Sequence, residues 1–425
     1  MTDSTARSGI NAHTGGAGAA HGLYERLVVA ALGEMTAGCL HLDLPNGETK
    51  IIGTPGAEVS ALIRVRDAAF FRKCVLFGDV GFGESYVDGD WDTDSIERVI
   101  AWAVLNVEHS PTMSGSKAKH FALNLLKWYN RALHRLRPNS LETSRRNIAE
   151  HYDLGNDFYC LWLDDTMTYS SAYFTEPRQS LESAQVAKYD ALCRKLQLRP
   201  DDHILEIGSG WGGFASHAVR TYGCRVTAVT ISEAQLAYAR ARFAREGIAD
   251  RAEVRLADYR TLTGLYDKIV SIEMMEAIGD RYLETYFARI HALLKPGGLV
   301  AVQYITVPDS RHAELKRGVD WIQKHIFPGS LLLSVGRVNL AINRTGDLFL
   351  HDLEDLGASY ARTLHAWWER FNGRVADVRA LGFDARFVRK WNYYLQYCEA
   401  AFASRNISVV QAVYTRPNNR ALHRA

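Results

Sequence analysis

The sequence lacks most of the features that would place it outside the cell or within a membrane. Its six cysteines lie far apart and form no C-x-x-C pair, which favours reduced thiols and argues against a zinc ribbon. The longest apolar run, Val99 to Leu105, is far shorter than the ~18 residues of a membrane span. The first 20 residues are polar or rich in glycine and alanine, without the apolar region of a signal peptide. We therefore expect a cytoplasmic chain with a disordered tail over residues 1–20.

An excess of either charge is also missing. Lys and Arg number 50 against 48 Asp and Glu, so the net charge is only +2 and nothing global points to nucleic acid. Hydrophobic residues make up 47% of the chain and charged residues 23%, which is an ordinary globular balance. At about 150 residues per domain, a chain of 425 residues has room for two or three domains.

Residues 21–110 are typical of a small α+β domain. A short helix is expected over 22–32, alternating strands over 40–44 and 59–65, and helices over 70–107. Asn46-Gly47 is a strong hairpin signal between the first of these strands and Ile51-Ile52. Strands first and helices afterwards predict an α+β arrangement.

The acidic segment Asp88 to Asp94 invites a calcium interpretation. An EF-hand loop that starts at Asp88 needs glycine at its sixth position and glutamate at its twelfth, where this chain has Thr93 and Val99. A capped turn ahead of a helix over Ser95–Leu105 is the better interpretation, and we predict no metal site.

Residues 111–139 are expected to hold a linker and a basic helix. Lys117 to Arg137 contains six basic residues and no acidic one, with aromatic and aliphatic residues interleaved. Two interpretations stay open: a connecting helix with a solvated basic face, and an amphipathic helix at an anionic membrane surface.

From about residue 180 onward, strands and helices alternate. Strands are predicted over 203–207, 225–230, 252–256, 266–272 and 299–305, each separated from the next by a helix or loop, and two late strands over 383–391 and 407–415. The pattern predicts a doubly wound α/β sheet with an antiparallel edge pair.

The first chemical motif is L-E-I-G-S-G-W-G-G-F, over 205–214, in which a strand runs into a glycine turn. The spacing of Gly208, Gly210 and Gly213 fits a dinucleotide fingerprint, but the next strand ends at 230–232 without the acid that would hold a ribose. Glu206 within the first strand and Asp258 after the third resemble the S-adenosylmethionine (SAM) fold instead. Ser232 and Gln235 form a capping-box pattern before the next helix.

Further motifs lie outside this turn. They are H-Y-D-L-G-N-D-F-Y (151–159), M-T-Y-S-S-A-Y-F (167–174), S-I-E-M-M-E-A-I-G (271–279), F-P-G (327–329), 357–371 and Y-Y-L-Q-Y-C-E-A-A-F (393–402). Together with the glycine turn they resemble the cyclopropane-fatty-acid synthase family, which includes the mycolic acid cyclopropane synthases. The resemblance implies a Rossmann-like SAM methyltransferase domain over 140–417, and residues 20–110 resemble the N-terminal domain of longer bacterial members.

The resemblance implies transfer of the SAM methyl group to a cis double bond of an unsaturated phospholipid chain. A carbocation forms, and loss of a proton from the new methyl closes a cyclopropane ring; the alternative is a fatty-acid C-methyltransferase that stops at a methyl or methylene branch. The SAM ligands implied are Tyr169, Ser170, Glu206, Gly208, Gly210, Trp211, Gly212, Thr230, Ile231, Gln235, Asp258 and Tyr259.

The family also implies a bound bicarbonate as the base. Its matching ligands are Ser171, Glu276, Gln303, Tyr360 and the backbone of Ile305. Ser171 and Gln303 depart from the family's cysteine and histidine, and Ala277 replaces a common histidine. Both replacement side chains can donate hydrogen bonds to an anion, but the site loses a titratable imidazole. Whether the product is a ring or a methyl branch therefore stays open.

Plainer interpretations of single residues also stay open. Glu276 could be a surface carboxylate at a helix start, and Tyr360 a buried core aromatic. Cys398 matches a cysteine proposed as a nucleophile in the family, although methyl transfer to an alkene needs no covalent enzyme intermediate and a buried structural thiol is favoured. Tyr360, Trp211 and Phe174 are the aromatic residues expected to line an acyl tunnel.

The partner expected from the resemblance is an unsaturated phospholipid at the inner membrane surface, so the chain would be peripherally membrane-associated. The sequence leaves the oligomeric state open, a homodimer included. A lipid-binding protein on an inactive methyltransferase fold is the alternative of another class, against which the glycine turn and Glu276 speak. Nucleic-acid methylation is disfavoured because no N-P-P-Y-like motif is present.

Overall fold

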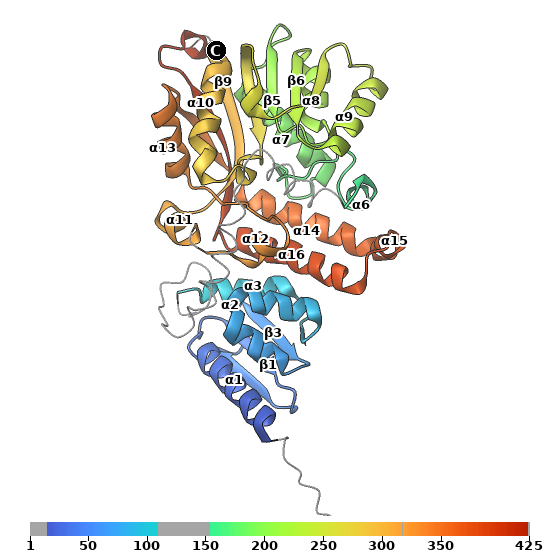
Figure 1. Ribbon diagram of the computed structural model, residues 1–425, viewed down its shortest axis with the longest axis vertical. Coiled ribbons are helices and arrows are strands. Elements are labelled where there is room, and N and C mark those ends of the chain that lie inside the picture. Colours follow the sequence, from blue (N-terminus) through green and yellow to red (C-terminus); the bar gives the residue numbers. More distant parts are fainter. Residues whose placement is uncertain (1–14, 109–153, 317, 424–425) are drawn as a thin grey trace, which may run out of the picture.

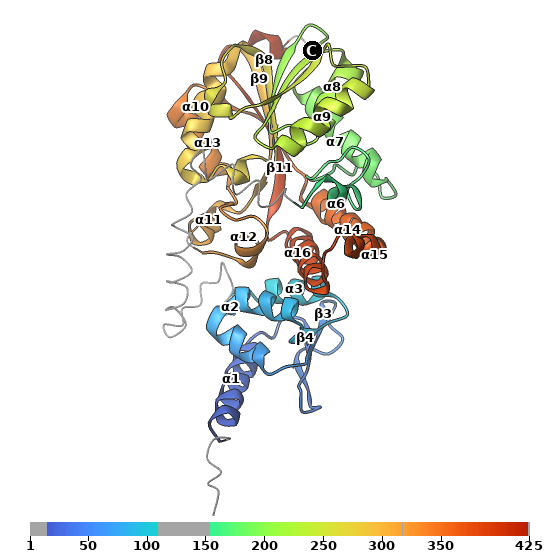
Figure 2. The ribbon, with the colours of Figure 1, turned by 45° about the vertical axis from the view of Figure 1, so that its right-hand side comes forward.

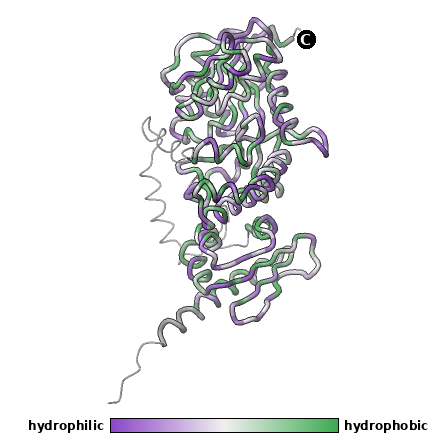
Figure 3. The backbone as a smooth tube through the Cα atoms, turned by 90° about the vertical axis from the view of Figure 1, so that its right-hand side faces the viewer, coloured by the Kyte–Doolittle hydropathy of each residue, from purple (hydrophilic) through white to green (hydrophobic). Residues whose placement is uncertain are grey.

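The computed structural model describes residues 15–108, 154–316 and 318–423 (Figure 1). The basic segment predicted over 117–137 and most of the predicted tail lie outside these ranges. Hydrophobic and hydrophilic stretches alternate along the tube in Figure 3, and no helix within the described ranges is long and apolar enough to cross a membrane. All six cysteines are free thiols.

The N-terminal part contains a small sheet of four strands in the order β2-β1-β3-β4. Its strands are β1 (Cys39–Asp43), β2 (Thr49–Gly53), β3 (Ser60–Val65) and β4 (Trp91–Asp92). The predicted hairpin is confirmed: β1 and β2 are antiparallel, and Gly47 adopts φ +88° in the turn between them. Helix α1 (Gly15–Gly33) begins before the helix expected over 22–32.

Two helices complete this part, α2 (Ala69–Asp88) and α3 (Ile96–Leu105). The capped turn predicted before α3 is confirmed, because the Ser95 hydroxyl accepts a hydrogen bond from the Arg98 backbone N–H at 3.1 Å.

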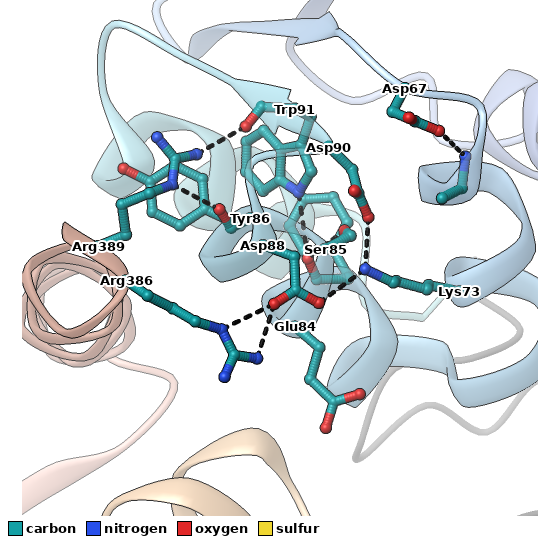
Figure 4. Close-up of polar contacts among 12 residues, drawn as sticks. Asp67, Lys73, Glu84, Ser85, Tyr86, Asp88, Asp90, Trp91, Arg386 and Arg389 are labelled. Carbon is teal, nitrogen blue, oxygen red and sulfur yellow. Dashed lines mark hydrogen bonds and ion pairs between the residues drawn. The ribbon is translucent and has the colours of Figure 1, made fainter. Parts of the chain in front are cut away.

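The small sheet and its helices dock on helix α16 (Ala385–Ala403) through Arg386 and Arg389 (Figure 4). Arg389 donates to the backbone oxygens of Tyr86 at 2.7 Å and Trp91 at 2.9 Å. Arg386 bonds the Asp88 carboxylate at 2.6 Å. Helix α2 also lies tightly against α12 (Trp321–His325), because a Cβ at Gly83 would lie only 2.5 Å from the Trp321 ring. This packing joins both parts through one hydrophobic cluster.

The C-terminal part is built on a large sheet of seven strands in the order β10-β11-β9-β8-β5-β6-β7. Its strands are β5 (His203–Ile207), β6 (Arg225–Thr230), β7 (Ala252–Leu256), β8 (Tyr266–Ile272), β9 (Leu294–Thr306), β10 (Phe349–Asp355) and β11 (Ser408–Thr415). Strands β5 to β9 pair in parallel, whereas β11 is antiparallel to both β9 and β10. The predicted doubly wound sheet with an antiparallel edge pair is therefore confirmed.

Helices cover both faces of the large sheet (Figure 2). One face carries α7 (Leu181–Lys195), α8 (Gly213–Tyr222) and α9 (Glu233–Arg245), and the other carries α10 (Leu283–Leu293) and α13 (Val335–Thr345). Each layer has its own buried apolar cluster against the sheet. Helices α14 (Gly357–Gly373) and α16 lie between the large and small sheets, with α6 (Asn156–Cys160), α11 (Asp309–Leu315) and α15 (Val375–Ala380) around them (Figure 1).

The strand predicted over 383–391 is wrong, because this segment forms the start of α16. The Asp384 side chain caps the helix by accepting from the Phe387 N–H at 2.7 Å. The rings of Phe383, Phe387 and Trp391 stack at 4.2 and 5.2 Å, a contact that helical spacing of the last two permits. The edge strand is β10 instead, with the sequence F-L-H-D-L-E-D. It pairs with a neighbour on one side only, so its charged residues can remain partly exposed.

Candidate active site

One cavity of about 380 Å³ lies between the carboxyl ends of the parallel strands and the helices α14 and α16. Open α/β sheets bind ligands at this edge, where the strand order reverses. The residues that follow strands β5, β6 and β8 line the cavity. Helices α14 and α16 contribute Tyr360, Tyr394 and Cys398.

The glycine turn predicted from sequence forms one wall of the cavity. Gly208, Gly210 and Gly212 have φ of +90°, +48° and +84°, a region that side chains disfavour. Nothing lies within 4 Å of a Cβ built on Gly210, so a side chain there would project into open space. Gly212 does not line the cavity; it caps α8 from behind, where a Cβ would lie 2.9 Å from the Phe243 ring.

Two charged groups lie buried under this turn. Burial raises the pKa of Glu206 well above its usual value, and its Oε2 has no hydrogen-bond partner within the described part of the chain. Burial also lowers the pKa of Lys188 to about 8, although Glu273, Asp164 and Glu206 act the other way. The Lys188 ammonium donates to the Ser170 hydroxyl at 2.7 Å. The wall therefore holds a carboxylate oxygen that can still accept a donor.

The other predicted SAM ligands also reach the cavity. Thr230 ends β6, Ile231 and Gln235 follow it, and Asp258 and Tyr259 follow β7. Only half of the predicted capping box forms: Ser232 accepts from the Gln235 N–H at 3.3 Å, but the Gln235 side chain accepts from the Thr230 hydroxyl at 2.8 Å instead of returning to the helix start. Asp258 is already paired with Arg260 at 2.7 Å.

The opposite wall contains Glu273, a residue that the motif analysis did not select. It follows β8 directly and has the left-handed φ of +48°. Its Oε1 accepts from the Ser171 N–H at 2.8 Å and from Gln303 Nε2 at 2.7 Å, and its Oε2 accepts from the Tyr360 hydroxyl at 2.7 Å. Burial raises the pKa of Glu273, whereas these three hydrogen bonds act to lower it.

Three of the predicted bicarbonate ligands, Ser171, Gln303 and Tyr360, are therefore brought together, but around the chain's own carboxylate. Gln303 Nε2 uses its second hydrogen on the Ser171 carbonyl at 3.2 Å, and the Ser171 hydroxyl donates to the Ala172 carbonyl at 2.9 Å. Ser171 and Gln303 are fully buried and do not line the cavity. These residues do not fit a bicarbonate, because their donor hydrogens already have acceptors.

Glu276 lies on the same wall in a different environment. The Ile305 N–H donates to its Oε1 at 2.6 Å, as the predicted pairing of these two residues suggests, but its Oε2 has no partner within the described residues. Burial first, and the nearby Glu273 second, raise the pKa of Glu276 to about 8. Near neutral pH, Glu276 is therefore mostly protonated. It faces the cavity, which does not support the interpretation as a surface carboxylate.

The remaining predicted residues divide between the cavity and its surroundings. Tyr360 and Trp211 line the cavity, whereas Phe174 does not and lies 3.9 Å beneath the Arg362 guanidinium instead. Cys398 faces the cavity, and burial raises the pKa of its thiol, which disfavours the nucleophilic thiolate. Tyr169 and Tyr394 share a hydrogen bond between their hydroxyls at 2.7 Å.

Sequence reasoning missed Glu273 and Lys188. Glu273 could have been found from its position, because an acid immediately after a central parallel strand lies at the ligand edge of the sheet. Lys188 carried no such signal: it sits in the middle of an amphipathic helix, where lysine ordinarily faces solvent.

Comparison with known proteins agrees with this architecture. The family model of mycolic acid cyclopropane synthetase matches residues 139–412. The chain is 37% identical over 387 residues to the tuberculostearic acid methyltransferase UfaA1 of Mycobacterium tuberculosis, covering 88% of each chain. It is 37% identical over 358 residues to the cyclopropane-fatty-acyl-phospholipid synthase of Escherichia coli, covering 83% of this chain and 87% of the relative.

A solved structure extends the similarity to three dimensions. The mycolic acid cyclopropane synthase CmaA1, complexed with SAH and CTAB, superimposes with a TM-score of 0.59 at 28% identity, covering 64% of this chain and 98% of that one. The family match spans the large sheet, the cavity and the helices above it. The chain therefore belongs to the mycolic acid cyclopropane synthetase family of SAM-dependent lipid methyltransferases.

Proposed function

We propose that this protein transfers the methyl group of SAM to the cis double bond of an unsaturated phospholipid acyl chain and closes a cyclopropane ring there. One observation carries the proposal. A single cavity joins the glycine turn to a hydrogen-bonded carboxylate, with apolar and aromatic side chains between them. Such a cavity can bring a methyl donor, an alkene and a base together away from bulk water.

The glycine-turn wall suits SAM. Glu206 Oε2 offers an acceptor without a partner among the described residues, and Gly210 leaves open space in front of the turn. When bound, SAM supplies an electrophilic methyl group. The residues proposed to hold it are those that line this side of the cavity: Tyr169, Ser170, Glu206, Gly208, Gly210, Trp211, Thr230, Ile231, Gln235, Asp258 and Tyr259.

The wall formed by α14, α16 and the α12 region suits an acyl chain. Ile322, Phe327, Leu364 and Phe402 present apolar surface to the cavity, and Tyr360 and Tyr394 add aromatic rings. Methyl transfer leaves positive charge on the neighbouring alkene carbon. Aromatic faces stabilise such a cation by about 0.5–2 kcal/mol each, and exclusion of water keeps the cation from being hydrated.

The alternative product is a methylene or methyl branch in place of the ring. The similarity to a tuberculostearic acid methyltransferase supports this alternative. A ring and an exocyclic methylene are isomers, since both require methyl addition and the loss of one proton from the new methyl group. A methylene branch additionally needs a hydride shift, and a saturated methyl branch needs a reductant as well. We propose the ring because it needs neither the hydride shift of a methylene branch nor the reductant of a saturated methyl branch.

The direct test is the product formed by the purified chain on vesicles of an unsaturated phospholipid, with SAM that carries a trideuterated methyl group. We expect the acyl chain to gain one methylene unit and retain two of the three deuterium atoms. Resistance to mild hydrogenation then distinguishes a ring from a methylene branch. Recovery of unmodified lipid, with SAM bound normally, would support the alternative of an inactive lipid-binding fold.

We also propose that the phospholipid is met at a membrane surface. The basic segment over 117–137 carries the prediction, although it lies outside the described residues. Each Lys or Arg near an anionic surface contributes about 1 kcal/mol, and salt weakens the attraction. Sedimentation with anionic vesicles should therefore exceed sedimentation with neutral ones at low salt. Equal binding to both kinds of vesicle would instead support the interpretation of this segment as a connecting helix.

A further inference from the structure

Glu273 lies where the protein could use a carboxylate on a reacting lipid. It follows β8 at the ligand edge of the large sheet and lines the same cavity as Gly210 and Glu276. Its left-handed φ of +48° is unusual for a residue other than glycine, and its N–H is tied to the Gln303 carbonyl at 2.7 Å. Backbone strain of this kind persists only where the surroundings impose it, and it clusters at functional positions.

The hydrogen bonds fix the orientation of the carboxylate. Oε1 accepts from the Ser171 N–H and from Gln303, which fills both of its lone pairs. Among the described residues, Oε2 accepts from Tyr360 alone, so one of its lone pairs is left to take a proton. Three donors from three distant segments thus position a single free acceptor site on Glu273.

We propose that Glu273 is the general base of the reaction and takes the place that a bound bicarbonate would fill. The proposal rests on the proposed function. As the C–S bond of the donor breaks, a C–C bond forms to one alkene carbon and positive charge develops on the other. A C–H bond of the transferred methyl then breaks: its proton goes to Glu273 Oε2, and its electron pair forms the second C–C bond of the ring.

The two carboxyls of this wall differ in the way that this step requires. Glu273 is held by three hydrogen bonds that stabilise its ionised form, and Lys188 supplies a buried positive charge nearby. Glu276 receives a hydrogen bond from the Ile305 N–H, but burial and the nearby Glu273 raise its pKa to about 8. Environments that separate two carboxyls in this way commonly assign one as base and the other as acid.

Two variants of Glu273 test the proposal. Glu273→Gln preserves size and most hydrogen bonds but cannot take the proton, so turnover should fall by ~10²–10⁴ while SAM affinity stays the same. Glu273→Gly tolerates the positive φ and removes the side chain, which leaves Ser171, Gln303 and Tyr360 with free donors around an empty space. Its turnover should also fall, and millimolar sodium formate or bicarbonate should restore part of it.

The matched control is formate on Glu273→Gln, where the amide still fills the space and no rescue is expected. Parental turnover in Glu273→Gln, or equal rescue of both variants, would overturn the proposal. These outcomes are read only after the parental chain has been shown to add methylene units to vesicle lipid. A parental chain that binds SAM but modifies no lipid would instead refute the proposed function, so the two failures are distinguishable.

Discussion

The two walls of the cavity treat a buried carboxylate in opposite ways. On the glycine-turn wall, Glu206 has an oxygen without a partner among the described residues, and burial raises its pKa strongly. On the other wall, Glu273 is less completely buried and accepts three hydrogen bonds. An unpartnered buried carboxylate is costly, whereas a partnered one is not. We infer that the first wall is completed by a ligand, whereas the carboxylate of Glu273 is already held by donors of the chain itself.

The largest expected effect comes from filling the first wall. Gly210→Val should abolish measurable SAM binding, because the new side chain projects into the open space before the turn and the φ of +48° disfavours it. Gly247→Val is the matched control: Gly247 has φ +69°, open space around its Cβ and no place in the cavity. Both variants should be destabilised, but only the first should lose SAM in calorimetry. Normal SAM affinity in Gly210→Val would contradict the assignment of this wall.

Replacing the carboxyl of Glu206 is a milder test of the same wall. Because burial disfavours the ionised form of Glu206, Glu206→Gln should weaken SAM binding by about 0.5–1.5 kcal/mol, the usual net contribution of a hydrogen bond between neutral groups. Because Gln keeps the size of the side chain, the large sheet should stay intact by circular dichroism. If SAM affinity is unchanged, the unpartnered oxygen of Glu206 has another purpose.

The raised pKa of Glu276 predicts a pH dependence of stability. A carboxyl titrating at about 8 in the folded protein and at about 4.5 in the unfolded chain binds more protons when folded between these values. Its contribution is full below about pH 4.5 and is lost as pH rises toward 8. Glu276→Gln removes this loss, so the variant should gain about 3 kcal/mol relative to the parent between pH 5 and 8, at 1.36 kcal/mol per unit of pKa difference.

Urea unfolding of parent and variant at both pH values measures this difference. Parallel pH profiles would contradict the raised pKa. Turnover should also fall far less in Glu276→Gln than in Glu273→Gln, since glutamine imitates the protonated carboxyl that Glu276 already presents near neutral pH.

Cys398 should give the smallest effect. Burial raises the pKa of its thiol, so little thiolate forms, and the proposed reaction needs no enzyme nucleophile. Cys398→Ser should therefore change turnover by less than ~10-fold, below the usual range for a lost acid–base group. A loss as large as that of Glu273→Gln would make Cys398 a participant in the chemistry.

The same contrast explains which features could be predicted from the sequence. The glycine turn is contiguous, and its strand, turn and helix signals lie within residues 205–214, so the sequence alone places these residues at one edge of the sheet, where Gly208, Gly210 and Trp211 line the cavity. The second wall joins Ser171, Glu273, Gln303 and Tyr360, whose contacts span up to 132 positions. Family resemblance selected Ser171, Gln303 and Tyr360 but not Glu273, because only the folded chain brings Glu273 between them.

The errors in the fold have a local origin. Residues 383–391 mix aromatic and basic residues with a period that suits either a strand or a helix, and Asp384 capping together with ring stacking decides for α16. Strand β10 is an edge strand with three acidic residues in seven, so it lacks the apolar pattern by which the inner strands were recognised.

The most direct test of the central claim is the turnover of the parental chain in carbon dioxide-free buffer, compared with the same buffer after bicarbonate is restored. If Glu273 takes the proton, product should form at the same rate in both buffers, and Glu273→Gly alone should respond to added bicarbonate. A parental rate that falls on removal of bicarbonate and recovers on its return would contradict the account.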